Sequence, residues 1–345
     1  MYKNGGCRRT VVKTSSRGRL YLDWEPMPRV PDQYLECVVY LYPSIVAADK
    51  GDQVGGTGFI VRIDDGEPPT DFYYVVTNKH VIEQGNTTVR FNTPSRRHEA
   101  FEYDESNWFK AKNADLATYL LPDPDPRALD FRPVVPGAFV TRERIASHDI
   151  GIGDEVFFAG RFINAEGKDR NRPSLRFGTI AQVSTDLIDG EESFLVEARS
   201  IPGYSGSPVF VYLTTGMPRG VMFRSMGGPS HGLGPWLLGV DWSHINDYVD
   251  AKDDRGNKLP FKIRSNSGMM GVVPVWKLEE LLFRQDVKDM RAKDPRKKRA
   301  ATPDAASKDV ASRDSFPPAS GENPKHREDF NSLLNAAVKT PELKD

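Results

Sequence analysis

Between residues 36 and 275 the sequence repeats one pattern, in which short runs of Val, Ile, Phe and Tyr alternate with turn residues. Gly, Pro, Asp and Asn separate the runs. Short strands with such punctuation favour an all-β sandwich or set of barrels over βαβ units. The expected strands are Cys37–Tyr42, Thr57–Arg62, Phe72–Thr77, Thr88–Phe91, Leu116–Leu121, Glu155–Arg161, Leu175–Val183, Phe194–Arg199, Val209–Tyr212 and Trp236–Asp241.

A Pro/Asp stretch, Pro122–Pro126, divides this region, and the segment after it is poorly periodic to about residue 150. The sequence therefore predicts two β units, one at about 36–130 and one at about 150–275. Residues 1–35 are expected to be an N-terminal leader. The first 22 residues are basic, but no apolar stretch follows them, so a secretory signal is not expected.

The C-terminal part of the sequence changes character twice. Residues 273–283 place apolar side chains at helical spacing after a proline, which predicts a closing helix. Lys, Arg, Asp, Pro, Ala and Ser then dominate residues 284–345, a composition typical of a largely disordered tail. Within this tail, residues 328–339 carry a short apolar face at helical spacing, which predicts a short helix for a protein partner to bind.

Charge and cysteine content exclude several classes of function. The net charge of −1 provides no global field for nucleic acid or anionic membranes, and no apolar run approaches the roughly 20 residues that span a bilayer. Only Cys7 and Cys37 are present, so reduced thiols and a cytoplasmic location are expected. The other histidines show no metal-ligand spacing, and we expect neither a metal nor a cofactor.

The segment Gly203-Tyr-Ser-Gly-Ser-Pro208 has the composition of a turn that exposes a serine. Amide hydrolysis through a serine needs an exposed hydroxyl, a base, and backbone N–H groups that face the developing oxyanion. Glycines two before and one after Ser205 allow such a turn, with the amides of Gly203 and Ser205 converging on one point. Taken alone, the segment is equally compatible with an ordinary Gly/Ser/Pro loop.

Two further residues supply the chemistry that such a serine requires. His80 follows a strongly β segment, Phe72–Val76, at the point where the chain begins a helical turn, which suits a general base. Asp115 stands at the start of an apolar strand, where an imidazole N–H would be a good partner for its carboxylate. The alternatives are a structural histidine and an aspartate that caps the strand entry.

The order His80, Asp115, Ser205, with intervals of 35 and 90 residues, resembles the trypsin/chymotrypsin superfamily of serine endopeptidases. The pattern is most similar to bacterial, disulfide-free members such as the peptidase domain of the high-temperature-requirement proteases, here without a PDZ segment. Further segments resemble the superfamily in the right order: Thr57–Val61, Ile152–Gly160, Phe177–Ala181, Leu238–Trp242 and Gly271–Trp276.

The resemblance implies two six-stranded antiparallel β-barrels within residues 36–283, followed by the terminal helix. It implies a catalytic triad of His80, Asp115 and Ser205, with the N–H groups of Gly203 and Ser205 as the oxyanion hole. The sequence departs from the pattern at Ser207, where many relatives have Gly or Ala, and in the long loop from Thr214 to Pro235.

By the same resemblance, Arg199, Ser200 and Asp241 line the pocket for the P1 side chain. Arg199 alone favours an acidic P1 residue, whereas Asp241 alone favours a basic one. A third alternative is that the two neutralise each other as an ion pair and leave a pocket for an uncharged side chain.

Two functions are therefore compatible with the sequence. The first is a serine endopeptidase that cleaves protein or peptide substrates through an acyl-enzyme intermediate. The second is a catalytically silent barrel that acts as a protein-binding module, with the tail as its interaction segment.

Overall fold

The computed structural model describes residues 8–14, 20–26, 30–53, 55–66, 71–122, 124–125, 128–163, 167–188, 191–214 and 234–300. The chain divides between Asp294 and Pro295, and the second part contributes only helix α7, Pro295–Ala300, to the described residues. Cys7, the predicted helix at 328–339 and most of the loop from Thr214 to Pro235 lie outside the described residues. None of the helices that are described is long and apolar enough to cross a bilayer.

The N-terminal residues form more structure than a leader implies. Strands β1 (Arg8–Thr14) and β2 (Leu20–Pro26) pair antiparallel in a two-stranded sheet of their own. Helix α1 (Gln33–Glu36) then leads into the first β unit.

The first β unit is an antiparallel sheet of seven strands, in the order β7-β6-β3-β4-β5-β9-β8. Six strands were expected for this unit, and one of the seven, β8, is only two residues long. The strands are β3 (Val38–Tyr42), β4 (Thr57–Asp64), β5 (Asp71–Thr77), β6 (Thr88–Asn92), β7 (His98–Glu102), β8 (Phe109–Lys110) and β9 (Ala117–Leu120). Helix α2 (Ile45–Lys50) follows β3, and helix α3 (Lys79–Glu83) follows β5.

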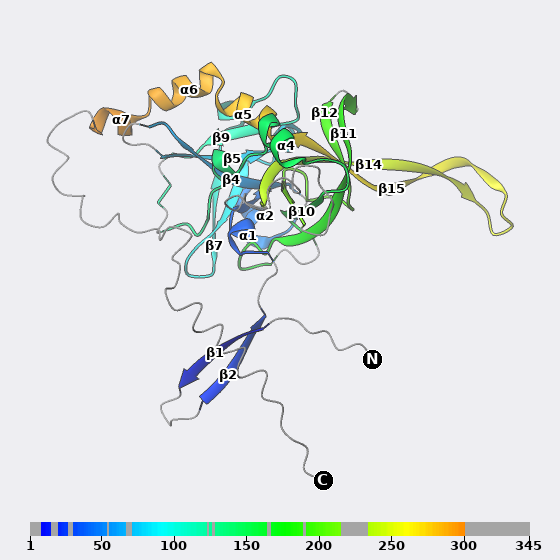
Figure 1. Cartoon of the computed structure of the whole chain (residues 1–345), viewed down its shortest axis with the longest axis horizontal. Helices are drawn as coiled ribbons and strands as arrows, with labels where there is room; N and C mark the ends of the chain where they lie inside the picture. Colours follow the sequence, from blue (N-terminus) through cyan, green and yellow to red (C-terminus); the bar gives the residue numbers. More distant parts are fainter. Residues whose placement is uncertain are drawn as a thin grey trace, which may run out of the picture. The chain divides into compact units, whose positions relative to one another are not determined.

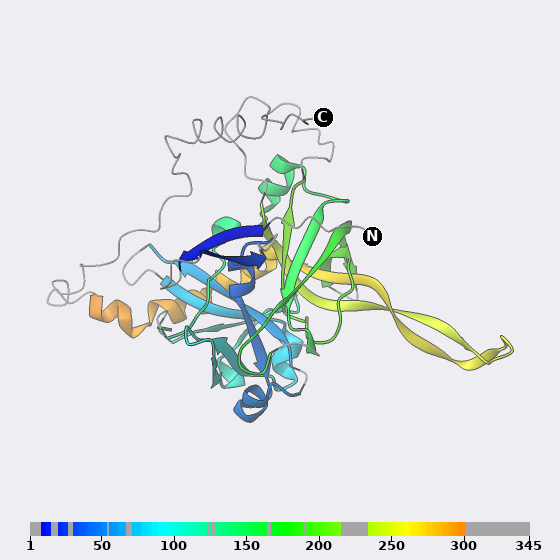
Figure 2. The same ribbon diagram turned by 90° about the horizontal axis from the view of Figure 1, so that it is seen from below.

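The second β unit is the expected closed antiparallel barrel of six strands, in the order β10-β11-β12-β15-β14-β13. The strands are β10 (Glu155–Gly160), β11 (Ser174–Ile188), β12 (Glu191–Glu197), β13 (Pro208–Tyr212), β14 (Trp236–Lys252) and β15 (Lys258–Pro274). Strands β14 and β15 are much longer than predicted and continue past the barrel as a two-stranded ribbon (Figures 1 and 2). The antiparallel two-unit architecture is chymotrypsin-like, as the sequence predicted.

The segment between the two units carries helix α4 (Arg142–His148) and makes one β-bridge to each side. Val134 bridges Val61 in the first sheet, and Phe139 bridges Leu237 in the barrel. The predicted divider is therefore packed against both units.

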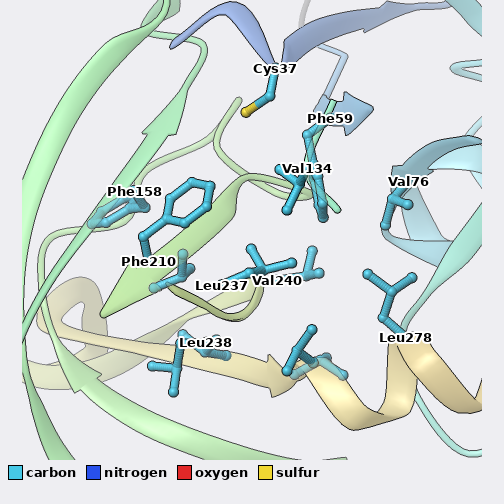
Figure 3. Packing of buried hydrophobic residues seen from close by; sticks show 14 of the residues in the cluster. Cys37, Phe59, Val76, Val134, Phe158, Phe210, Leu237, Leu238, Val240 and Leu278 are labelled. Carbon is cyan, nitrogen blue, oxygen red and sulfur yellow. The ribbon is translucent and has the colours of Figure 1, made fainter. Parts of the chain in front are cut away.

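One continuous hydrophobic core joins the two units. It contains Phe59 and Val76 from the first sheet and Phe158, Phe210 and Leu237 from the barrel, all buried (Figure 3). Leu278 of helix α5 (Val275–Leu282) is part of the same core, so the predicted closing helix seals it. Cys37 lies in this core as a free thiol, and burial raises its pKa to about 12.

Buried polar contacts also connect the two units. The guanidinium of Arg90, on β6, lies 5.0 Å from the ring centre of Tyr42 and donates to the carbonyl of Ala48 at 2.8 Å. Its Nε donates to Asn171 Oδ1 at 2.7 Å, on the segment between β10 and β11. Arg161, which follows β10, lies 4.3 Å from the same Tyr42 ring.

The sequence placed the start of the tail too early. Helix α6 (Gln285–Ala292) belongs to the folded part and buries Val287 and Arg291. Arg291 donates to Tyr74 Oη and to the carbonyl of Leu282, both at 2.9 Å, and pairs with Asp65 at 3.0 Å. The error arose because a charged composition was taken as a sign of disorder, although this arginine is buried against β5.

Replacing Arg291 with Met should destabilise the folded protein, because the side chains it contacts would lose a buried partner. The expected loss in the free energy of unfolding is about 3 kcal/mol, measured by urea denaturation. Lys288→Met, in the same helix but on its exposed side, should change stability by less than about 0.5 kcal/mol. Equal effects of the two substitutions would show that Arg291 does not anchor α6.

Candidate active site

The turn that carries Ser205 depends on two glycines. Gly203 and Gly206 have φ angles of +97° and +90°, in the left-handed region that favours glycine. A Cβ atom at Gly206 would also lie only 1.9 Å from the carbonyl oxygen of Thr57. The turn leaves Ser205 partly exposed, whereas the neighbouring Ser207 is fully buried.

Thr57, the first residue of β4, fixes this turn to the first sheet. Its Oγ1 donates to the carbonyl of Gly203 at 2.6 Å, and its N–H donates to the carbonyl of Ser205 at 2.8 Å. Its own carbonyl accepts from Thr77 Oγ1 at 2.7 Å, at the end of β5. A single buried threonine therefore connects the serine turn to the strand that leads to His80.

The pairing of β5 with β9 brings His80 and Asp115 together. Thr77, the last residue of β5, lies opposite Ala117, the first residue of β9. The chain leaving β5 and the chain entering β9 therefore run side by side, although 35 residues separate His80 from Asp115. Asn78 reinforces this arrangement by donating from Nδ2 to the carbonyl of Asp115 at 2.8 Å.

Asp115 holds His80 at two points. Its Oδ2 lies 2.5 Å from His80 Nδ1, and its Oδ1 accepts the backbone N–H of His80 at 2.9 Å. The Asp115 side chain is 10% exposed and that of His80 is 35% exposed. A proton on Nδ1 shared with the carboxylate leaves Nε2, the other ring nitrogen, free to accept a proton.

Gly56 provides the contact between the histidine segment and the serine turn. A Cβ atom at this position would lie 2.7 Å from Val81 Cγ1 and 3.2 Å from the carbonyl oxygen of Ser205. The residue next to His80 and the backbone of Ser205 therefore both pack against Gly56. No hydrogen bond joins Ser205 Oγ to His80 among the described residues.

The two N–H groups that the sequence assigned to an oxyanion hole have no hydrogen-bond partner in the described part of the chain. The N–H of Tyr204, between them, donates instead to the carbonyl of Ile201 at 3.1 Å. The Tyr204 side chain is fully buried, in edge contact with Phe158 of the barrel. The N–H groups of Gly203 and Ser205 can therefore accept a ligand without breaking a bond of the protein.

The three residues predicted for the P1 pocket separate into two environments. Ser200 and Asp241 are buried together, with Ser200 Oγ donating to Asp241 Oδ2 at 2.7 Å. Arg199 is exposed, and it forms no ion pair with Asp241 among the residues that the structure describes. The alternative of a neutralising pair is therefore not what the structure shows. The choice between an acidic and a basic P1 residue stays a prediction.

Asp241 is an unusual carboxyl group for its surroundings. It is 0% exposed, and burial raises its pKa from 3.8 to about 8, although the Ser200 hydroxyl and the Ser243 N–H counteract the shift. Its Oδ1 atom has no hydrogen-bond partner. The backbone of Asp241 pairs with the serine turn, since its carbonyl accepts from Gly206 N–H at 2.8 Å and its N–H donates to Ser207 at 2.9 Å.

Sequence reasoning missed three residues of this site: Thr57, Thr77 and Asn78. Each is a buried polar residue at the end of an apolar strand. That position was the available signal, because a buried polar side chain needs a partner. The sequence could not identify the partner, since Thr57 and Gly203 are 146 residues apart.

Other candidate features give no second site. Neither of the two surface cavities of the described residues is lined by His80, Asp115 or Ser205. Within the same residues, no cluster of His, Cys, Asp and Glu has the arrangement of a metal site.

Asp241 should make the stability of the protein depend on pH. Between its ordinary pKa and about 8, the folded protein binds a proton that the unfolded chain releases, so stability should fall as pH rises. Asp241→Asn removes this titration. Its free energy of unfolding relative to wild type should therefore rise by up to about 1.4 kcal/mol per pH unit between about pH 5 and 7. Urea denaturation at several pH values measures the difference, and a constant difference would contradict the assignment.

Comparison with known proteins gives one family match. Residues 56–215 match the model of the trypsin-like peptidase domain. A comparison with curated proteins found no significant match.

Solved structures with a similar fold include human heparin binding protein, with 11% identity and a TM-score of 0.42 over 77% of this chain and 96% of that one. A catalytically inactive tobacco etch virus protease in complex with substrate has 14% identity and a TM-score of 0.36 over 75% of this chain and 88% of that one. Similarity at this level carries no argument about function.

The family match covers the strand with Thr57, the His80 and Asp115 segments and the Ser205 turn. These are the segments that the fold brings together at the junction of two antiparallel β units. The chain belongs to the trypsin/chymotrypsin-like superfamily.

Proposed function

We propose that the protein is a serine endopeptidase in which Ser205 is the nucleophile, His80 the general base and Asp115 the residue that orients His80. The single observation that carries the proposal is the two-point contact of Asp115 with the ring and the backbone of His80. A carboxylate in this position fixes the histidine tautomer and stabilises the imidazolium that forms during catalysis.

The reaction would proceed in two halves. His80 Nε2 removes the proton of Ser205 Oγ as the oxygen attacks the carbonyl carbon of the scissile peptide bond. The N–H groups of Gly203 and Ser205 stabilise the negative oxygen of the tetrahedral intermediate. His80 then gives its proton to the leaving amine, the C–N bond breaks, and an acyl group remains on Ser205. Water, activated by His80, hydrolyses this ester and restores the serine.

The turn geometry supports the same assignment. Thr57 bonds the carbonyls of Gly203 and Ser205 to the first sheet, so neither carbonyl is available to bond an N–H of the turn. Electrostatic stabilisation of an oxyanion depends on donors that are held in place before the reaction begins. Preorganisation of this kind is expected of an active enzyme.

A fluorophosphonate probe, which reacts with activated serines, tests the nucleophile directly. Wild-type protein should be labelled, and Ser205→Ala should lose both the label and at least about 10⁴-fold in kcat for peptide hydrolysis. Ser207→Ala is the matched control, two residues away on the same turn, and should still be labelled. Labelling that depends on Ser207, or no labelling of a correctly folded wild-type protein, would favour the catalytically silent module.

Thr57 should act as a positioning residue for the turn. Thr57→Val preserves the volume of the side chain but removes the hydrogen bond to Gly203, so kcat should fall by about 10²-fold with little change in KM. Thr57→Ser retains the hydroxyl and should keep kcat within about threefold of wild type. If both variants lose the same activity, the methyl packing and not the hydrogen bond is responsible.

A further inference from the structure

Strands β14 and β15 form a ribbon that extends well beyond the barrel (Figures 1 and 2). Strand β13 pairs with β14 only as far as Val240, and β12 pairs with β15 only from Met269 onward. From Asn246 to Asn266 each strand of the ribbon therefore has only the other as its neighbour within the described structure. The ribbon is an addition to the barrel and is not needed to close it.

One face of the ribbon is apolar and exposed. Val249 lies directly opposite Ile263, and Phe261, two residues along β15, shares their face. These three side chains are 51%, 55% and 57% exposed. Antiparallel strands that alternate apolar and polar residues normally have their apolar face covered. We call these three residues the apolar face of the ribbon.

The opposite face is polar. Tyr248 lies opposite Arg264, and Asp250 lies opposite Lys262. Asp250 also pairs with Lys258 at 2.5 Å. A ribbon that was merely a solvated loop would need no such division into two faces.

The two outer edges of the ribbon differ in their capacity to bind another strand. Strand β15 contains Pro260, which has no N–H, and three basic residues, features with which proteins protect sheet edges. Strand β14 has no proline between Ser243 and Lys252. The edge of β14 is therefore the one open to β-strand addition.

This edge is continuous with the candidate active site. The strand begins its free run just after Asp241, whose backbone pairs with Gly206 and Ser207. From the other strand of the ribbon, Asn266 donates to the carbonyl of Ser200 at 2.6 Å. Residues 243–252 span about 30 Å. A polypeptide bound along β14 would lead directly to the Ser205 turn.

We propose that the ribbon from Asn246 to Asn266 is a binding site for the polypeptide substrate, remote from the bond that is cleaved. The proposal rests on the proposed function and adds a substrate class to it. An extended segment pairs with the edge of β14 and places alternate apolar side chains against the apolar face of the ribbon. Basic side chains at the other positions lie beside Asp250, which complements their charge.

A second copy of the chain is a weaker occupant of this surface. A stable complex of two proteins buries roughly 1,200–2,000 Å², which three half-exposed side chains cannot supply. A single extended strand needs no such area, because main-chain hydrogen bonds along the edge contribute to its affinity.

Peptide binding to the Ser205→Ala protein tests the site without cleavage. The probe is a fluorescein-labelled peptide of about twelve residues that alternates Val and Lys, and fluorescence anisotropy gives its Kd. An isomer with all Val residues in one block should bind at least about ten-fold more weakly, because it cannot present one apolar face.

Two matched pairs of substitutions locate the contact. Val249→Ser with Ile263→Ser, on the apolar face, should raise the Kd of the alternating peptide about ten-fold or more. Tyr248→Ser with Arg264→Ser changes the adjacent cross-strand pair on the polar face and should raise it less than about threefold. Thermal unfolding checks that both variants remain folded.

The outcomes separate this proposal from the proposed function. Intact fluorophosphonate labelling of the wild-type protein, combined with absent peptide binding or equal effects of the two pairs, overturns the substrate site but leaves the endopeptidase. Binding that follows the apolar face in a protein that is never labelled supports the site and overturns the endopeptidase. A dimer in sedimentation that the Val249→Ser, Ile263→Ser variant abolishes, without peptide binding, overturns the proposal in favour of a second copy.

Discussion

The hydrogen bonds of Thr57 are the interaction on which the site depends. Through its side chain, N–H and carbonyl, this one residue contacts the Ser205 turn and the end of the strand that precedes His80. The turn belongs to the second β unit and the histidine to the first, so their relative position is set at this residue. A hydrogen bond in a buried environment tolerates little displacement, because an unmade bond there costs the desolvation of both groups.

The arginines at the junction of the two units serve the same requirement. Arg90 contacts the carbonyl of Ala48 on one side and Asn171 on the other, and its guanidinium packs on the Tyr42 ring that Arg161 also contacts. Apolar packing alone is tolerant of small sliding movements, whereas directional bonds to carbonyl oxygens are not. The shared hydrophobic core therefore holds the two units together, and the polar contacts fix their register.

Much of the fold was predictable because strand periodicity and turn residues act locally. The ten predicted strands all exist, and most have ends within one or two residues of those observed. Strand β7 and most of β15 were missed, since charged residues in His98–Glu102 and Lys258–Arg264 obscure the alternation that their exposed faces produce. Helix α6 was missed for a related reason, because burial of Arg291 depends on Tyr74 and Asp65, which are distant in sequence.

The sequence by itself determined the residues that carry the chemistry: a serine between glycines, a histidine after a strand and an aspartate before one. It determined them because tight turns and strand ends impose local requirements on residue type. The tertiary structure alone decided how they meet, through the pairing of Thr77 with Ala117 and the bonds of Thr57. It also decided that Asp241 is buried with Ser200 while Arg199 is exposed. Contacts of this kind join residues from 20 to more than 140 positions apart, and no local pattern encodes them.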